Sequence, residues 1–252
     1  MVDHTVAGPL DGPAIVFIHG TRLTRGMWAP QMVGLSGGSR VIAVDLPGHG
    51  TRADEPFTLD RAADSVARVI DEAGGGRAVV VGLSLGGYVA MHLAERSPDR
   101  VRGLVLAGAT AEPSGIRQAP YRALALVMDT FDGHGLDAVN RWFFRARFPP
   151  SVAEPIVEGG FWATGGAAAL RCLAGHRFLP SLAAYPGRTL IVNGEFDLPF
   201  RLGQREFARA AQHARIVRLK RATHLCNLDQ PAAFNEAVRR FMTELDAVDL
   251  GD

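Results

Sequence analysis

The chain of 252 residues has few of the residue types that mark secreted, metal-binding or nucleic-acid-binding proteins. Its two cysteines, Cys172 and Cys226, are too few for a disulfide framework and lack the spacing of a metal site. We therefore expect a reducing compartment, and neither a metal nor a cofactor. Lysine occurs only once, at Lys220, yet the 27 basic residues balance the 26 acidic ones and are scattered, which argues against a nucleic-acid partner.

Long apolar segments are also missing. No stretch approaches the roughly 18 apolar residues that are needed to span a bilayer. The first 20 residues include Asp3, His4 and Asp11 and contain no apolar segment typical of a signal peptide. We therefore expect a soluble, cytoplasmic protein that does not associate with a membrane.

The most informative stretch is the apolar run that ends at Ser84. Residues 79–81 are three consecutive valines, which is typical of a strand buried on both faces of a parallel sheet. Gly82 and Gly86 lie two residues to either side of Ser84, where a tight turn leaves no room for side chains. A helical pattern follows over 88–96. Such glycine–serine clusters also occur in ordinary turns, so a function for Ser84 depends on partners elsewhere in the chain.

Strand and helix patterns alternate on both sides of this stretch. Strands are predicted over 14–18, 40–44, 101–107, 188–192 and 214–219, and helices over 26–35, 59–73, 201–211 and 231–245. In the last strand we expect Ile216 and Val217 to be buried. This alternation predicts an α/β fold with a mostly parallel, doubly wound sheet and helices on both of its faces.

The alternation is interrupted between residues 111 and 187. Helical patches are predicted there over 121–131, 135–144, 151–158 and 167–173, and the segment contains two of the three tryptophans. We predict a helical cap or lid, inserted at 111–187 between the two parts of the core, 1–110 and 188–252. The alternative is a plain helical subdomain whose aromatic side chains only form its own core.

A serine nucleophile needs a base within hydrogen-bond distance and a third group that orients the base. Asp197 follows the predicted strand 188–192, and His224 follows the strand 214–219. Both loops would open at the same sheet edge as Ser84. Residues 108–110 offer no carboxylate, which favours Asp197 as the acid, but Glu195 remains a rival that only geometry can exclude.

Five motifs give the chain a resemblance to the α/β-hydrolase superfamily, in family order and over nearly its whole length. They are His19-Gly20, Asp45-x-Pro47-Gly48-His49-Gly50, Gly82-x-Ser84-x-Gly86-Gly87, Gly194-x-x-Asp197 and His224. The resemblance implies a serine esterase with a helical cap, in which Ser84 is the nucleophile, His224 the base and Asp197 its orienting partner. By the same resemblance, the backbone N–H groups of Thr21 and Leu85 would form the oxyanion hole, while Asp45 and His49 would belong to a structural turn.

The chain departs from the family pattern in two places. Its N-terminal segment has room for at most one strand, so we expect the sheet to lack an N-terminal edge strand. Arg22 and Arg25 occur where many relatives have apolar residues, and they would either pair with acids of the cap or bind a substrate carboxylate. The cap acids considered are Asp129, Asp132 and Glu154. The other candidate substrate-binding residues are Trp142, Phe143, Trp162 and Leu225.

The sequence thus predicts a serine hydrolase that cleaves a small to medium, mainly apolar carboxylic ester through an acyl-enzyme. The same residues would also suit a carbon–carbon bond hydrolase, a lactonase or a perhydrolase. A ligand-binding receptor or regulator on the same fold is the alternative from another functional class. The sequence leaves the acyl group and the oligomeric state open.

Overall fold

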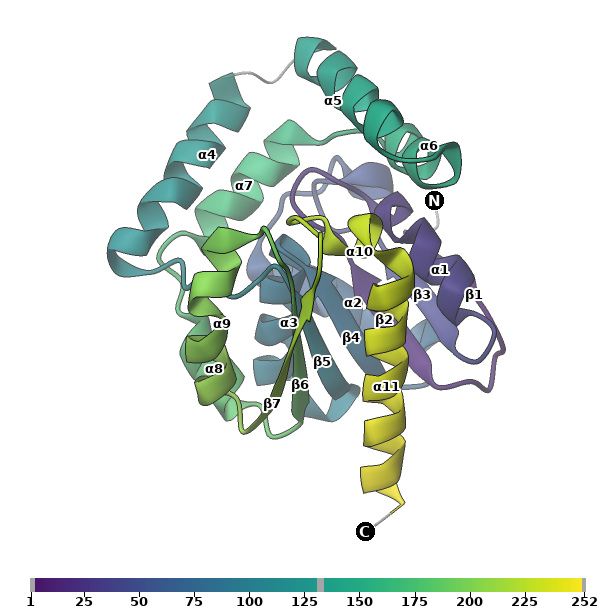
Figure 1. Cartoon of the computed structure of the whole chain (residues 1–252). Helices are drawn as coiled ribbons and strands as arrows, with labels where there is room; N and C mark the ends of the chain where they lie inside the picture. The colour runs from purple at the N-terminus through teal and green to yellow at the C-terminus, as the bar shows by residue number, and fades with distance from the viewer. Residues whose placement is uncertain (1–2, 131–133, 251–252) are drawn as a thin grey trace.

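A seven-stranded sheet forms the centre of the computed structural model, which describes residues 3–130 and 134–250 (Figure 1). The strands are β1 (His4–Ala7), β2 (Ala14–Ile18), β3 (Arg40–Val44), β4 (Ala78–Leu83), β5 (Val101–Ala107), β6 (Arg188–Gly194) and β7 (His213–Leu219). Their order is β1-β3-β2-β4-β5-β6-β7, in which β1 runs antiparallel to β3 and every other pair is parallel. As expected, only one strand precedes Ala14 among the described residues.

Helices cover both faces of the sheet because its central strands are apolar on both sides. In β4, Val80 packs into one hydrophobic core while Val79 and Val81 pack into the other. The first core contains side chains of α2 (Leu59–Ala73), α3 (Leu85–Arg96), α8 (Phe178–Ala184) and α9 (Leu198–Ala210), and the second those of α1 (Ala29–Leu35), α10 (Cys226–Asp229) and α11 (Pro231–Asp249). The doubly wound α/β fold predicted from the alternation is thereby confirmed. None of the described helices is long and apolar enough to cross a membrane.

Strand β7 differs from the central strands. Ile216 is 36% exposed and Val217 is only half-buried, so the prediction that both are buried is wrong. The physical reason is that β7 pairs only with β6 and ends the sheet. A strand at an edge has fewer neighbours to cover its side chains.

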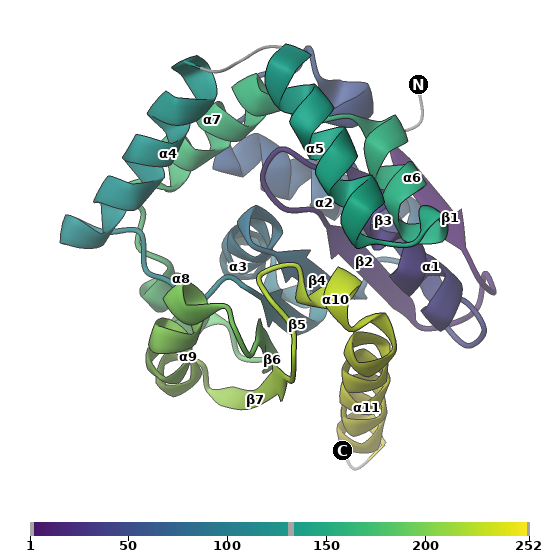
Figure 2. The ribbon, with the colours of Figure 1, turned by 45° about the horizontal axis from the view of Figure 1, so that its top comes forward.

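The segment predicted as a cap lies over the carboxyl ends of the strands (Figures 1 and 2). Its elements are the 3-10 helix η4 (Gly115–Gln118) and the helices α4 (Ala119–Thr130), α5 (His134–Arg147), α6 (Pro150–Gly159) and α7 (Ala163–Leu173). Helix α4 packs against α7, and α5 packs against α6. Helix α8 was not predicted, and it packs against α3 of the core before the chain enters β6. The domain boundaries 111 and 187 stay a prediction, and Phe131 and Asp132 lie outside the described residues.

Candidate active site

Ser84 occupies the turn between β4 and α3. Its backbone angles, φ 52° and ψ −116°, are ones that residues other than glycine rarely adopt. A Cβ atom at Gly82 would lie 2.2 Å from the carbonyl of Gly86, and one at Gly86 would lie 2.1 Å from the carbonyl oxygen of Ile18. Only glycine fits where these backbones converge, and the predicted strand, sharp turn and helix are present.

His224 and Asp197 meet at the carboxyl ends of β6 and β7. The Nδ1–H group of His224 donates a hydrogen bond to Oδ2 of Asp197, with 2.9 Å between the two atoms. A carboxylate in this position holds the ring with its other nitrogen, Nε2, available as a base. Glu195 is engaged elsewhere, because its carboxylate accepts the backbone N–H of Arg221 at 2.8 Å. Of the two candidate acids, Asp197 is therefore the one that holds His224.

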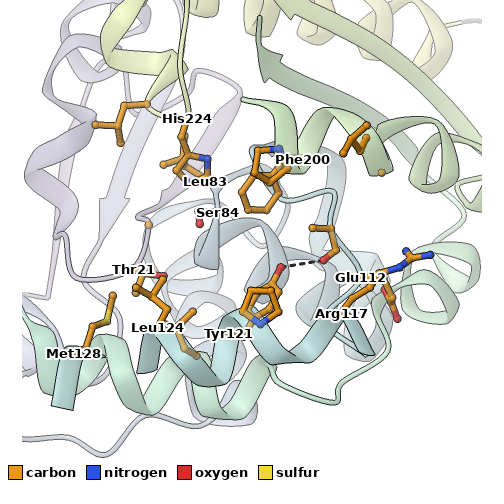
Figure 3. A pocket seen from close by; sticks show the side chains of 18 of the residues that line it. Thr21, Leu83, Ser84, Glu112, Arg117, Tyr121, Leu124, Met128, Phe200 and His224 are labelled. Atoms are coloured by element: carbon orange, nitrogen blue, oxygen red, sulfur yellow. Dashed lines mark hydrogen bonds between the residues drawn. The ribbon is translucent and has the colours of Figure 1, made fainter. Parts of the chain in front are cut away.

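Ser84 and His224 line the same cavity, whose volume is about 930 Å³ (Figure 3). The cavity lies between the sheet edge, η4 and α4 on the cap side, and the start of α9. Most of its lining is apolar, and the leucine and methionine side chains in it are Leu23, Leu83, Leu124, Met128, Leu170, Leu202 and Leu225. Arg117 and Glu206 also line it and form an ion pair at 2.9 Å. The cavity thus places Ser84 and His224 in a mainly apolar environment.

Two backbone N–H groups near Ser84 could hold an oxyanion. The N–H of Leu23 donates to the carbonyl of Gly20 at 3.2 Å, which closes a turn around Thr21. This turn runs beside Ser84, since a Cβ atom at Gly20 would lie 3.7 Å from Cβ of Ser84. Among the backbone hydrogen bonds of the described residues, none is donated by the N–H of Thr21 or of Leu85. Their role as oxyanion donors stays a prediction.

The histidines of the neighbouring loops are structural. Nδ1–H of the buried His19 donates to the carbonyl of Gly20 at 2.9 Å, and its Nε2 accepts the N–H of Leu46 at 3.0 Å. Nδ1–H of His49 donates to the carbonyl of Pro47 at 3.0 Å. Burial lowers the pKa of His19. Burial lowers the pKa of His49 to about 3, together with the repulsion that a second protonated ring would meet at His19. Both rings are therefore neutral at neutral pH and brace the loops.

Asp45, and not an acid of the cap, pairs with Arg25. That Arg25 binds a substrate carboxylate stays a prediction, and Arg25 is absent from the described cavity lining. Nη1 of Arg25 lies 2.6 Å from Oδ2 of Asp45, and the backbone N–H of Arg25 donates to Oδ1 at 2.9 Å. The backbone N–H and the hydroxyl of Thr51 donate to the same carboxylate. The cap acids have other partners, because Asp129 pairs with Arg171, and Glu154 pairs with Arg145 at 2.9 Å. Arg25 therefore forms its ion pair with the neighbouring Asp45 and not with the cap.

Of the other predicted substrate-binding residues, some line the cavity and some do not. Leu225 lines it, whereas Arg22, Trp142, Phe143 and Trp162 are absent from its described lining. Trp142 is 70% exposed on α5. The backbone N–H of Trp162 donates to the carbonyl of Arg22 at 2.9 Å, which fastens the start of α7 to the loop that contains Thr21. That these four residues touch substrate therefore stays a prediction that the cavity lining does not support.

Most residues of the lining were not predicted from the sequence, and Phe200 and Glu112 are two of them. The ring of Phe200 stacks on that of His224, with 4.8 Å between the centroids and 22° between the planes. Glu112 accepts the N–H groups of Phe178 and Leu179, and burial raises the pKa of its carboxyl. The only sequence signal for Phe200 is its position three residues after Asp197, in the first turn of a helix. Among the described residues, no group of three or more His, Cys, Asp or Glu side chains is placed to hold a metal.

Residues 15–237 match the Alpha/beta hydrolase family, which is most of the chain. The chain belongs to this family. The solved structures that resemble it include a thermophilic esterase from Thermogutta terrifontis with malate bound, at a TM-score of 0.80 and 28% identity, covering 96% of this chain and 93% of the other.

The family relatives include an esterase and a lactonase. A pimeloyl-[acyl-carrier protein] methyl ester esterase of Nitrosomonas europaea is 40% identical over 138 residues, which are 52% of this chain and 53% of the esterase. The chain thus spans about half the length of that relative. The 3-oxoadipate enol-lactonase 1 of Acinetobacter baylyi is 27% identical over 246 residues, which are 95% of this chain and 92% of the lactonase.

Proposed function

We propose that this family member is a serine hydrolase that cleaves a small to medium, mainly apolar carboxylic ester through a Ser-His-Asp triad. One observation carries the proposal: Ser84, on its strained turn, and the His224–Asp197 pair open into the same apolar cavity. An ester-cleaving activity is also in keeping with the esterase and the lactonase among the relatives.

The proposed reaction has two halves. In the first half, Nε2 of His224 takes the proton of the Ser84 hydroxyl while Oγ attacks the ester carbonyl. The N–H groups of Thr21 and Leu85 stabilise the oxyanion of the tetrahedral intermediate, and each such donor contributes about 3 kcal/mol. The intermediate then breaks its bond to the alcohol oxygen, which receives the proton from His224. In the second half, His224 takes a proton from water, the hydroxide oxygen attacks the acyl-enzyme, and the acid leaves as Ser84 regains its proton.

The cavity supports the substrate class. A volume of about 930 Å³ lies near the upper end of the usual range for small-molecule sites, and its lining consists mainly of apolar side chains. Burying an apolar acyl or alkyl group there contributes about 0.8 kcal/mol per CH₂. The carbon–carbon hydrolase alternative would call for a basic residue that holds an acidic substrate. Arg22 and Arg25 do not belong to the described lining, and Arg117, which does, is paired with Glu206.

The proposal is tested by replacing the nucleophile. Ser84→Ala should lower kcat for a short-chain p-nitrophenyl ester by at least about 10³-fold, because water alone then has to attack. Ser151→Ala is the matched control, since Ser151 is exposed on the cap helix α6, and it should keep wild-type activity. Thermal unfolding of both variants checks that the fold is intact.

Two results would contradict the proposal. The first is persistent turnover by folded Ser84→Ala. The second is a folded wild-type protein that neither turns over esters nor is labelled at Ser84 by a fluorophosphonate probe, which would favour the ligand-binding receptor.

A lactone is the second candidate substrate, because the enol-lactonase relative matches this chain over 95% of its length. A panel of esters, lactones and vinylogous diketones, each assayed with wild-type protein and with Ser84→Ala, would rank these reactions by kcat/KM. A perhydrolase would show itself by a gain in activity toward the same esters when hydrogen peroxide is added.

A further inference from the structure

The imidazole of His224 is held from two directions. Its Nδ1–H is bonded to Asp197, and one face of its ring is stacked on Phe200. Asp197 and Phe200 belong to the same short segment: Asp197 is the N-cap of α9, and Phe200 lies in the first turn of that helix. The orientation of His224 therefore depends on where this first turn of α9 lies relative to the sheet.

A buried polar network fixes that first turn. The hydroxyl of Thr110 donates to the carbonyl oxygen of Phe200 at 2.6 Å and accepts from Nδ2 of Asn193 at 3.2 Å. The same Nδ2 group donates to Oε1 of Gln204, one turn further along α9, at 3.2 Å. Thr110 and Asn193 are fully buried, so the hydrogen bond between them forms away from competing water, while the bonds to Phe200 and Gln204 are partly buried.

Two glycines show how tightly the residues around this network are packed. A Cβ atom at Gly203 of α9 would lie 1.9 Å from the carbonyl oxygen of Thr110. A Cβ atom at Gly108, where φ is +52°, would lie 2.8 Å from Cε1 of His224. The N–H of Gly108 donates to Oδ1 of Asn193 at 3.2 Å, so one asparagine side chain fixes both the segment beside His224 and the helix that bears Phe200.

We infer that Thr110 and Asn193 are positioning residues, which hold the His224 imidazole in its productive orientation through Phe200 and the first turn of α9. The inference rests on the proposed role of His224 as the base. Neither Thr110 nor Asn193 lines the cavity, so their effect should appear in the chemical step and not in substrate binding. A base that is displaced by a fraction of an ångström from its proton donor loses rate steeply, even when the substrate still binds.

The test uses a pair of substitutions at one atom. Thr110→Val removes the hydroxyl with almost no change in shape, and Thr110→Ser keeps it. We expect Thr110→Val to lower kcat for the p-nitrophenyl ester about tenfold with KM changed less than twofold, and we expect Thr110→Ser to restore most of the rate. Thr189→Val is the control. Thr189 is also buried and lies in β6, the same strand as Asn193, but its hydroxyl has no hydrogen-bond partner among the described residues.

A spectroscopic signal separates this inference from the proposed function. Stacking on Phe200 shifts the carbon-bound ring protons of His224 upfield in the NMR spectrum. The shift should be reduced in Thr110→Val and in Phe200→Leu, and retained in Thr110→Ser and Thr189→Val. Because no turnover is needed, the spectra decide the positioning role even if no ester is cleaved.

The inference is overturned if folded Thr110→Val keeps both the wild-type kcat and the His224 shift. If Thr110→Val does not fold, Phe200→Leu takes its place: it removes the stacked ring and should lower kcat about tenfold while Phe200→Tyr retains the rate. Equal rates in Phe200→Leu and Phe200→Tyr would then overturn the inference.

Discussion

Asp45 and Asp197 both follow a strand at the same edge of the sheet, and they are 2% and 5% exposed. Among the described residues, the carboxylate of Asp45 accepts hydrogen bonds from Arg25 and Thr51. The carboxylate of Asp197 holds a ring that also lines the cavity. The two carboxylates are similarly buried. They differ in that the partner of Asp197 lines the cavity, whereas the partners of Asp45 are absent from its described lining.

The largest expected effect comes from making the two aspartates neutral. Asp197→Asn should lower kcat by about 10³- to 10⁴-fold, because an amide stabilises neither the required tautomer of His224 nor its charged form. The free energy of unfolding should change by much less than for the same substitution at Asp45. Steady-state kinetics and urea unfolding of the same samples measure both quantities.

Asp45→Asn is the matched control and should show the reverse. It leaves the Arg25 guanidinium without its anion and points an amide N–H₂ toward other donors, at a cost of about 2–4 kcal/mol in the free energy of unfolding. The activity of each folded molecule should stay within threefold of the wild type. Loss of activity in Asp45→Asn at full stability would remove the distinction between the two sites.

The loop beside Asp45 should also make stability depend on pH. His49 has a pKa of about 3 when folded and 6.5 as its ordinary value, so between these pH values the unfolded chain binds a proton that the folded one does not. The stability is complete above pH 6.5 and is lost as the pH falls, by about 1.5 kcal/mol between pH 6.5 and 5. His49→Asn, whose amide can still donate to the carbonyl of Pro47, should remove this part of the pH dependence in urea unfolding. An unchanged slope would show that His49 binds protons equally in the folded and the unfolded chain, which contradicts its lowered pKa.

The smallest effect is expected at Trp142 in the cap, where a substitution tests whether this side chain contacts the substrate. Its side chain is 70% exposed and outside the described lining, so Trp142→Ala should change kcat/KM by less than twofold and the free energy of unfolding by about 0.5 kcal/mol or less. A rise in KM of fivefold or more would instead place Trp142 at the substrate, as the sequence had suggested.

Patterns of apolar residues predicted the helices and strands that have a regular apolar periodicity. The helix over 59–73 and the strand over 101–107 have the predicted bounds, because each has a regular apolar pattern of sufficient length. The helices α8 and α10 were missed, since seven and four residues are too few for a helical period to appear. Ile216 was expected to be buried because an apolar pattern does not tell an edge strand from a central one.

The candidate site likewise has a part that local motifs predicted and a part that they did not. Motifs with fixed spacing placed Ser84, Asp197 and His224 on loops that meet in the structure. Contacts between distant side chains were not predicted, such as the ion pair of Arg25 with Asp45, 20 residues away, and the stacking of Phe200 on His224. Such contacts depend on how loops fold over one another, which no local pattern encodes.

The turn at Ser84 also has a consequence for how the chain can evolve. At φ 52° and ψ −116°, a side chain costs of order 1–3 kcal/mol that glycine would not. Glycine at this position would thus give a more stable protein that lacks the hydroxyl we propose as the nucleophile. Selection for stability alone would favour glycine there, so the role that we propose for the serine would oppose stability at this residue.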